Sequence, residues 1–324
     1  MSLKESILKV LEENRDQFVS GQELAERLNV SRAAVWKAVK KLRQEGHEII
    51  ASPNNGYRLE YLSDILSEPG IRLYLSPENK DLPIFIFDEV ESTNSLAKKL
   101  AAEGAQNGSI IVAEGQSKGR GRMGRSFYSP SGTGLYMSMI LSVHEDMNSA
   151  LFTTIYAGVA VCRVINRFVD KEAKIKWVND ILIDGKKVCG ILTESISDFE
   201  SGMVETVILG IGLNIKTENF PDEIREIADS ISVYHIPRNR FVAEIANEVL
   251  CLKHQSRKTV IEEYKRRSIM LGKEIEYSDK GRRRSGKVLD INDNGHLIVK
   301  EESGRVTALM YGEVVVKKAG LYKS

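Results

Sequence analysis

The most informative stretch of this sequence is Gly119-Arg120-Gly121-Arg122-Met123-Gly124-Arg125. It lies between a predicted strand that ends near Glu114 and another that begins near Leu135. Glycines let backbone N–H groups approach an anion closely, and arginines form charge-assisted, two-pronged hydrogen bonds with phosphate. Similar runs also occur as disordered nucleic-acid tethers, but those usually repeat within low-complexity surroundings. A single run between two strands therefore predicts an anion-binding loop, and its spacing fits neither the Walker P-loop nor the dinucleotide fingerprint.

The block around this loop, about residues 63–270, is predicted to be one domain in which several strands follow one another directly. Strands are predicted at 84–87, 109–113, 135–141, 174–177, 188–192 and 204–210, and helices at about 95–103, 149–168 and 240–267. Asp184-Gly185 is typical of a two-residue hairpin turn. This order predicts an α+β fold with a mixed or largely antiparallel sheet and packed helices, and it disfavours a doubly wound dinucleotide fold. Residues 61–83, with Pro69-Gly70 and Pro77, are predicted to form a connecting segment.

Residues 1–62 predict a separate unit of three helices and a hairpin. Apolar residues recur at helical spacing from Leu3 to Leu11, and Ser20 and Ser31 stand where helix N-caps are expected. Gly46 is placed to end the third helix, and Pro53-Asn54-Asn55-Gly56 joins two short predicted strands. Because the second and third helices are joined by a very short turn, the pattern predicts a winged helix-turn-helix.

The third helix of this unit carries a local excess of positive charge. Arg32, Lys37, Lys40, Lys41 and Arg43 face a single acidic residue, Glu45. Most charged runs of this kind are solvated helix faces. Here, small residues at the helix start would let the backbone approach DNA, so DNA binding is the favoured interpretation. The predicted DNA contacts are Ser20, Ser31, Arg32, Ala33, Trp36, Lys37 and Lys40.

The carboxyl-terminal residues, 271–324, change character again. Five short strands are predicted at 274–277, 285–291, 296–300, 305–309 and 313–317, with Asp293-Asn294-Gly295 and Ser303-Gly304 as turns. Five short strands in so few residues predict a small SH3-like β-barrel.

Composition limits the classes of partner. Lys and Arg total 46 and Asp and Glu 45, a formal net charge of +1, so nucleic-acid binding would need a local patch. The three widely spaced cysteines, Cys162, Cys189 and Cys251, predict neither disulfides nor a zinc site, and we expect them to be buried. The charged amino terminus does not resemble a signal peptide, and the longest uncharged stretch, 147–162, is too short for a membrane span. We expect a cytoplasmic protein.

Three further clusters could carry chemistry. Glu91-Ser92-Thr93-Asn94 stands between a strand and a helix, where it could simply be an N-cap or could hold a small polar ligand. Lys176-Trp177-Val178-Asn179-Asp180 precedes Lys186 and Lys187, which could neutralise a phosphate or carboxylate or could be solvated turn lysines; for Lys186 we prefer the second interpretation. Gly210-Ile211-Gly212-Leu213-Asn214 ends a strand with glycines where a ligand could come near.

Taken in order, these motifs resemble those of the biotin protein ligases. The resemblance rests on Ser92-Thr93-Asn94, Gln116, the Gly119–Arg125 run, the Lys-Trp-x-Asn-Asp run, Lys187 and Gly-x-Gly-x-Asn, and it covers essentially the whole chain. The winged helix adds a similarity to the bifunctional type, which combines ligase and biotin operon repressor. Two positions depart from the family pattern: Val178, where proline is common, and Phe127, where some members have tryptophan.

The resemblance implies a two-step, ATP-dependent reaction with Mg²⁺. Biotin and ATP give biotinyl-5'-AMP and pyrophosphate, and a lysine of a biotin carboxyl carrier protein then takes the biotin. It implies catalytic roles for Lys187, Arg120 and Arg122. The implied biotin contacts are Ser92, Thr93, Asn94, Gln116, Arg120, Gly121, Arg122 and Lys187, and the implied nucleotide contacts are Arg120, Arg122, Phe127, Asn179 and Asn214. No protein ligand for the metal is identified, and Mg²⁺ is expected to accompany ATP.

The resemblance also implies that biotinyl-5'-AMP is a corepressor, so that the adenylate-bound chain is a homodimer on operator DNA. Two alternatives remain. A ligand-sensing transcription factor without catalysis would share the winged helix but would not need Lys187 together with both arginines. A lipoate protein ligase would share fold and chemistry, but lipoate has no ureido group for the Ser-Thr-Asn-Gln set to bind.

Overall fold

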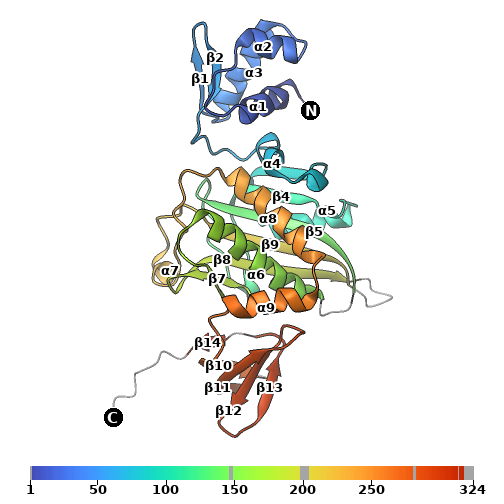
Figure 1. The fold of residues 1–324 in the computed structure, drawn as a ribbon, viewed down its shortest axis with the longest axis vertical. Helices are drawn as coiled ribbons and strands as arrows, with labels where there is room; N and C mark the ends of the chain where they lie inside the picture. The colour runs from blue at the N-terminus through green and yellow to red at the C-terminus, as the bar shows by residue number, and fades with distance from the viewer. Residues whose placement is uncertain (1, 146–148, 198–203, 280–281, 313, 317–324) are drawn as a thin grey trace.

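A computed structural model describes residues 2–145, 149–197, 204–279, 282–312 and 314–316. Figure 1 shows three bodies in a row: an amino-terminal head, a central body built on one large sheet, and a small carboxyl-terminal sheet. None of the helices in the described part of the chain combines the length and apolar character that a membrane span requires.

The head has the predicted winged helix-turn-helix arrangement. Its elements are α1 (Leu3–Glu13), α2 (Gly21–Arg27), α3 (Arg32–Gln44), β1 (Ile49–Ser52) and β2 (Gly56–Leu59). The side chains of Ser2, Ser20 and Ser31 cap the three helices, and β1 pairs with β2 as an antiparallel hairpin. The helices bury a separate apolar core, in which Leu11, Leu24 and Leu42 are fully buried.

The sequence predicted that the segment after the head is only a connection, but the structure contains regular elements there. It contains α4 (Glu68–Tyr74) and a single 3-10 turn, η1 (Pro77–Asn79). Ser67 caps α4 by accepting a hydrogen bond from Gly70 N, and Pro69 lies in the first turn. Proline is tolerated there because the first-turn N–H groups have no partner within the helix, so Pro69-Gly70 does not prevent helix formation.

The central sheet has seven strands in the order β3-β4-β5-β9-β8-β7-β6. Their bounds are β3 (Ile84–Val90), β4 (Ile110–Gln116), β5 (Gly134–Glu145), β6 (Lys174–Lys176), β7 (Asp180–Ile183), β8 (Lys186–Ser197) and β9 (Val204–Asn214). Only β3 and β4 pair in parallel among these strands, so the mixed, largely antiparallel sheet is confirmed. The turn between β7 and β8 is the predicted one, with Asp184 and Gly185 both at positive φ.

Helices cover both faces of this sheet. On one face α5 (Thr93–Ala102) packs Ala97 against Ile111, Ile140 and Ile208. The other face carries α6 (Ser149–Phe168), α8 (Arg238–Lys253) and α9 (Arg257–Arg267), which share the largest core with β4, β5, β8 and β9 (Figure 1). The prediction of a single helix over 240–267 is wrong: α8 ends at Lys253, and Ser256 caps a new helix, α9. A short helix, α7 (Asp222–Arg225), follows β9.

The carboxyl-terminal strands form one antiparallel sheet in the order β13-β12-β11-β10-β14. Their bounds are β10 (Glu274–Asp279), β11 (Arg282–Ile291), β12 (Leu297–Glu301), β13 (Val306–Leu309) and β14 (Val314–Val316). Residues of this sheet, among them Ile275 and Leu297, belong to the same apolar core as the central body. Trp177 Nε1 also donates to Gly295 O at 3.0 Å, so the two bodies are in firm contact.

The three cysteines are free thiols, but only two of them are buried as expected. Cys162 and Cys189 are fully buried, and burial raises the pKa of Cys162 to about 12. Cys251, on α8, is exposed, so the expectation of burial is wrong for this residue.

A buried ionic cluster fixes the chain where it leaves the head. Arg238, 2% exposed, donates from N and Nε to the two carboxylate oxygens of Asp64, at 2.7 and 3.0 Å. The same guanidinium lies 2.8 Å from Glu114, whose other oxygen accepts from Leu66 N at 3.0 Å. Lys216 Nζ also contacts Asp64, at 2.9 Å. This cluster holds the linker against the central body.

We predict that Asp64→Asn loosens this linker without unfolding the protein. The substitution keeps the shape but removes the charge that Arg238 and Lys216 face, and hydrogen bonds to charged groups contribute roughly 1.5–3 kcal/mol. Amide exchange at Leu66 and Ser67 should therefore accelerate about 10-fold or more, while exchange in α3 is unchanged. Unaltered exchange at both amides would show that the Asp64 charge does not hold the linker.

Candidate active site

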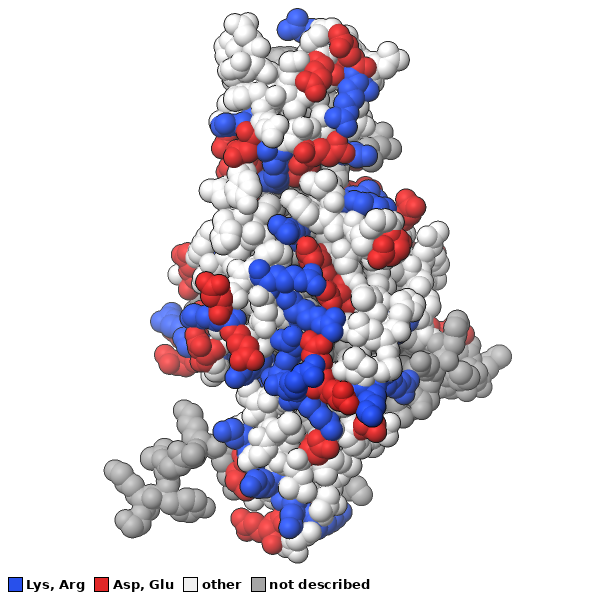
Figure 2. Space-filling view, in the orientation of Figure 1, with Lys and Arg blue, Asp and Glu red and all other residues white. Residues whose placement is uncertain are grey.

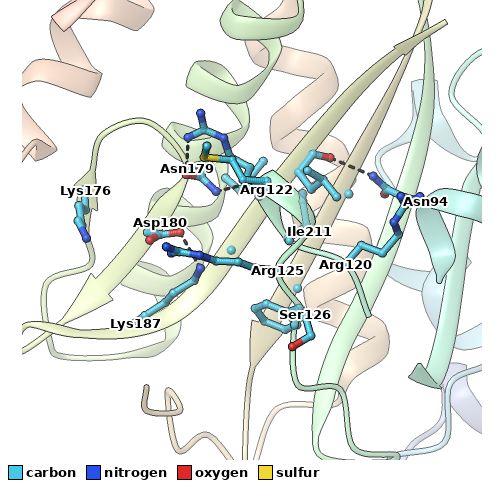
Figure 3. A pocket seen from close by; sticks show the side chains of 18 of the residues that line it. Asn94, Arg120, Arg122, Arg125, Ser126, Lys176, Asn179, Asp180, Lys187 and Ile211 are labelled. Carbon is cyan, nitrogen blue, oxygen red and sulfur yellow. Dashed lines mark hydrogen bonds and ion pairs between the residues drawn. The ribbon is translucent and has the colours of Figure 1, made fainter. Parts of the chain in front are cut away.

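One cavity, of about 210 Å³, collects most of the central-body residues singled out from the sequence (Figure 3). Its walls come from the start of α5, the end of β4, the Gly-Arg run, the Lys176–Asp180 segment and strands β8 and β9. Gly312, Val314 and Val315 of the carboxyl-terminal body also line it. The site is therefore assembled from segments that are far apart in the sequence.

Glycines on β8 and β9 make the floor of this cavity. A Cβ at Gly210 would lie 2.1 Å from Asn94 Oδ1, and one at Gly212 would lie 2.5 Å from the Phe127 ring. Gly190, paired with Gly212 across the two strands, lies under both Phe127 and Lys187. The absence of side chains lets Asn94, Phe127 and Lys187 lie directly on the sheet.

The polar cluster at the start of α5 lies at one end of the cavity. Ser92, Thr93 and Asn94 are buried, and Ser92 occupies the N-cap position without a side-chain capping bond. Gln116 Oε1 accepts from Thr93 N at 2.8 Å and from Thr93 Oγ1 at 3.1 Å. The N-cap interpretation alone therefore does not account for Ser92, and beside it Thr93 and Gln116 are connected parts of a polar wall.

The Gly-Arg run folds back on itself as a small hairpin over the cavity. Phe127 N donates to Gly119 O at 2.8 Å, and Gly121 N donates to Arg125 O at 2.7 Å. A Cβ at Gly119 would lie 2.3 Å from Phe127 O, so the two arms can pair only because this residue is glycine. The tip is a 3-10 turn, η2 (Arg122–Gly124), in which Met123 and Gly124 have positive φ.

Arg122 connects the tip of this hairpin to two other parts of the site. Its Nη1 donates to Asn179 Oδ1 at 3.1 Å, and its Nη2 lies 3.5 Å from Gly312 O of the carboxyl-terminal body. Asn179 in turn donates from Nδ2 to Ile191 O at 2.9 Å. Arg122 and Asn179 are thus brought together, as the sequence predicted for residues of one site.

Lys187 lies beside Asp180 and Arg125, on the same side of the cavity as Asn179 and opposite Asn94 (Figure 3). Its Nζ forms a 2.7 Å ion pair with Asp180 and lies 5.9 Å from the centre of the Phe127 ring. Lys186 instead points to a largely exposed contact with Asp229 at 3.8 Å. This difference agrees with the preference for Lys186 as a solvated turn lysine and Lys187 as a site residue.

The described lining of the cavity is strongly positive. Its charged members are Arg120, Arg122, Arg125, Lys176 and Lys187, against the single acidic residue Asp180. Such a surface is suited to an anion with several charges. Arg120 extends toward the Asn94 end, where its Nη1 lies 3.4 Å from Ser95 Oγ (Figure 3).

A second surface is presented by α3 in the head. Ser31, Arg32, Ala33, Trp36, Lys37 and Lys40 are all exposed, whereas Val35, Val39 and Leu42 are buried. Trp36 is 54% exposed, and Lys40 Nζ lies 5.3 Å from the centre of its ring. Ser20 is half-buried and caps α2. One face of α3 is therefore free to enter a groove while the other anchors the head core.

Positive charge on the central body has a different character. Figure 2 shows Lys and Arg gathered over the helices of this body with acidic side chains among them. Arg163 pairs with Glu263 at 2.5 Å, and Arg167 pairs with Glu244 at 2.6 Å and with Glu248. These ion pairs neutralise much of the patch, so the head is the better candidate for DNA contacts.

Known proteins resemble this chain both in the part that forms the cavity and in the head that carries α3. Residues 86–214 match the model of the biotin/lipoate A/B protein ligase family, and residues 4–58 match an HTH domain. The bifunctional ligase/repressor BirA of Bacillus subtilis and that of Bacillus spizizenii are each 34% identical to the chain, over 94% of this chain and 95% of the relative. The chain belongs to the bifunctional biotin ligase/repressor family. A solved structure of the Aquifex aeolicus biotin protein ligase with biotin and ATP has a TM-score of 0.60 at 25% identity, covering 73% of this chain and 99% of that one.

The cavity of this family member contains nearly all the predicted ligand-binding residues, but Asn214 is outside the cavity lining. Ser92, Thr93, Asn94, Gln116, Arg120, Gly121, Arg122, Phe127, Asn179 and Lys187 line it. Asn214 is buried at the end of β9 and donates from Nδ2 to Asp229 O at 3.0 Å. Its contact with a nucleotide stays a prediction.

Sequence reasoning missed several residues of this ligase/repressor site. Asp180 was named in the Lys-Trp-x-Asn-Asp run but was given no role of its own, and its pairing with Lys187 could have been suspected from the intervening hairpin. Gly312 and Val315 carried no signal, because their place follows from the docking of the carboxyl-terminal body. Ser138 and Glu194 do not line the cavity but contact the Asn94 side chain behind it, at 2.7 and 2.9 Å; they lie within strands and look like ordinary polar strand residues.

Proposed function

We propose that the chain is an ATP-dependent biotin protein ligase that also represses biotin genes by binding operator DNA with biotinyl-5'-AMP as corepressor. Family membership supports both halves of this proposal. The observation that carries it in the structure is one cavity with a neutral polar wall at one end and Lys187 with Arg122 at the other. The uncharged ureido ring of biotin needs the polar wall. The biotin carboxylate, where it meets the triphosphate of ATP, needs the positive charges.

The uncharged polar wall at the Asn94 end fits the ureido ring of biotin. Ser92, Thr93, Asn94 and Gln116 offer hydrogen-bonding groups that a buried ureido group requires, because burying it unpaired is costly. Arg120 and Gly121 of the Gly-Arg hairpin would close over the bound molecule. Biotin would then extend along the cavity toward Lys187.

The positive end fits the reacting groups. In the first step a carboxylate oxygen of biotin attacks the α-phosphorus of ATP, and pyrophosphate leaves. Negative charge accumulates as the two anions meet, and Lys187 and Arg122 would stabilise it. Phe127 offers a ring against which adenine can stack, and Asn179 a polar contact.

The second step needs no protein nucleophile. The amine of a carrier-protein lysine attacks the carbonyl of the mixed anhydride, loses a proton, and AMP leaves. The acceptor is the biotin carboxyl carrier protein of a biotin-dependent carboxylase. Activation is stored in the anhydride itself.

Mg²⁺ is expected to enter with the phosphates of ATP. Among the described residues, no group of three or more His, Cys, Asp or Glu side chains is placed to hold a metal ion. Asp180 is the acidic residue of the described lining, and it would help to position a hydrated cation that the phosphates carry.

Pyrophosphate release tests the proposal directly. With ATP, biotin should stimulate release and yield an adenylate, whereas lipoate at the same concentration should not. Stimulation by lipoate instead would favour a lipoate ligase. Biotin binding without any release of pyrophosphate would favour a ligand-sensing transcription factor that lacks catalysis.

Repression requires the two sites to communicate, and we propose that dimerisation does this. The arm that leads into the Gly-Arg hairpin continues the pairing of β4 with β3, the edge strand of the sheet, through Ser117 N to Val90 O at 3.0 Å and Lys118 N to Glu91 O at 2.8 Å, so the hairpin begins one strand away from the free edge. A hairpin ordered over the adenylate could complete a self-complementary surface at this edge. Two linked heads then grip two half-sites.

We predict that forming the adenylate raises both the dimer fraction and the operator affinity. The physical requirement is tighter adenylate binding by the dimer than by the monomer, because equal affinity shifts no population. Sedimentation with and without biotin plus ATP measures the first quantity, and operator titration in the same buffers the second. If neither changes, the switch is refuted, although the ligase assignment stands.

A further inference from the structure

Asn94 is held in one orientation by two acceptors: Glu194, which is outside the cavity lining, and the backbone carbonyl of Leu192, which is part of it. Its Nδ2 donates to Glu194 Oε2 at 2.9 Å and to Leu192 O at 3.2 Å. A carboxylate and a carbonyl can only accept hydrogen bonds, so the amide nitrogen must face them. The amide oxygen is thereby turned the other way, onto Gly210, where it occupies the space that a Cβ would need.

Glu194 is kept charged and in place by Lys98. Lys98 Nζ lies 2.6 Å from Glu194 Oε1, with the two side chains 36% and 21% exposed. Burial raises the pKa of Glu194, but the hydrogen bonds from Lys98 and Asn94 outweigh it, so the pKa lies below its usual value. Lys98 is one helical turn after Asn94 on α5, and both therefore reach the same carboxylate.

Other hydrogen bonds fix the remaining side chains of the polar wall. Ser138 Oγ lies 2.7 Å from Asn94 Oδ1 and 2.8 Å from Thr93 Oγ1. At the far end, Gln116 is oriented independently, because its Oε1 accepts from the backbone N–H of Thr93. The two amides of the wall are thus fixed by groups whose donor or acceptor character cannot change.

We propose that Glu194 is a positioning residue for biotin recognition, which with Lys98 fixes the Asn94 amide so that its oxygen serves the ligand end of the cavity. This inference rests on the proposed function, since it assigns the ureido group to this wall. Both Nδ2 hydrogens are used by Glu194 and Leu192 O, so Asn94 offers only an acceptor to the ligand. Its natural partner is a ureido N–H.

Glu194→Gln is the first test. A glutamine can donate as well as accept, so only the longer contact with Leu192 O, at 3.2 Å, still requires the NH₂ of Asn94 to face the sheet, and the amide can turn its NH₂ to the ligand more readily. We expect the Kd and the KM for biotin to rise about 10-fold or more. The KM for ATP and kcat should stay within about twofold of the wild type, because the phosphate end is untouched. Lys98→Met should shift biotin binding in the same direction.

Matched controls come from the same helix. Lys99 pairs with Glu103 at 3.9 Å on the exposed surface of α5, so Lys99→Met and Glu103→Gln remove equivalent charges without touching Asn94. Both should leave biotin binding unchanged.

Asn94→Asp supplies the test that a merely structural role would not pass. Alone, it sets a carboxylate against Glu194 and should weaken biotin binding. In the double variant with Glu194→Gln, the glutamine NH₂ can donate to one oxygen of Asp at position 94, the reverse of the wild-type hydrogen bond. The other oxygen of that carboxylate still faces the ligand. The double variant should therefore bind biotin more tightly than Asn94→Asp alone, by about 10-fold.

The outcomes are separable. Wild-type biotin affinity in Glu194→Gln would overturn the inference while leaving the ligase assignment intact. So would a loss of biotin and ATP binding together that the double variant does not recover, because that pattern marks general damage to the fold. Absence of biotin-dependent adenylate formation by the wild type would instead remove the proposed function itself.

Discussion

Lys187→Ala should slow biotin-dependent pyrophosphate release by about 10²- to 10³-fold, which is the usual cost of removing one group that stabilises developing charge. Lys187 Nζ lies over the Phe127 ring, and its pairing with Asp180 keeps it at the positive end of the cavity. Since Lys187 is partly exposed and outside the apolar cores, the variant should remain folded.

Lys186→Ala is the matched control for this prediction. The neighbouring lysine is exposed and faces Asp229 rather than the cavity, so its loss should leave the rate within about twofold. Measuring pyrophosphate release for both variants under saturating biotin and ATP separates a site-specific effect from a general loss of positive charge. A Lys187→Ala enzyme that works at the wild-type rate contradicts the assignment of this residue.

Removal of the head is expected to abolish specific operator binding while ligase activity is retained. Specific protein–DNA complexes are roughly 10³- to 10⁷-fold tighter than non-specific ones, so this is the largest effect that we predict. A chain that begins at Ser63 keeps Asp64 and the linker contacts with Arg238 and Glu114, and it leaves the main core complete. It loses the exposed face of α3 altogether.

Operator shifts and adenylate synthesis should be measured on the same preparation of the shortened chain. For the intact protein, log affinity should fall with log salt at a slope of about −0.9 for each phosphate contacted. Arg32→Ala, on the exposed start of α3, should weaken binding, whereas Arg266→Ala on α9 should not. Operator binding by the shortened chain would show that the DNA-binding surface lies elsewhere.

Local sequence patterns predicted the elements whose boundaries are set by nearby residues. Serine caps mark α2 and α3, Asp184-Gly185 marks the turn between β7 and β8, and the apolar stretch of α6 begins and ends at the predicted residues. Errors arose where tertiary structure decides. Taken alone, Pro69-Gly70 indicates a break in regular structure. In the fold, Ser67 caps α4 with its side chain, and its N–H donates to Asn239 of α8, so a tertiary contact holds the start of this helix.

The site divides in the same way. Local pattern singled out the Gly-Arg run and Lys187 as candidate site residues, and Gln116 was predicted only through the family resemblance; all of them line the cavity. Positioning residues left no such pattern. Glu194 is a single acidic residue in a strand, and only the pairing of Leu192 with Gly210 brings it beside Asn94.

The most direct test of the central claim is transfer of biotin to a carrier protein. Purified chain, biotin, ATP, Mg²⁺ and an unmodified biotin carboxyl carrier domain should give a carrier whose intact mass rises by one biotinyl group. The gain should require ATP and should disappear when the acceptor lysine of the carrier is replaced by arginine. An unchanged carrier mass with the wild-type acceptor, under conditions in which a characterised biotin protein ligase modifies it fully, would contradict the account.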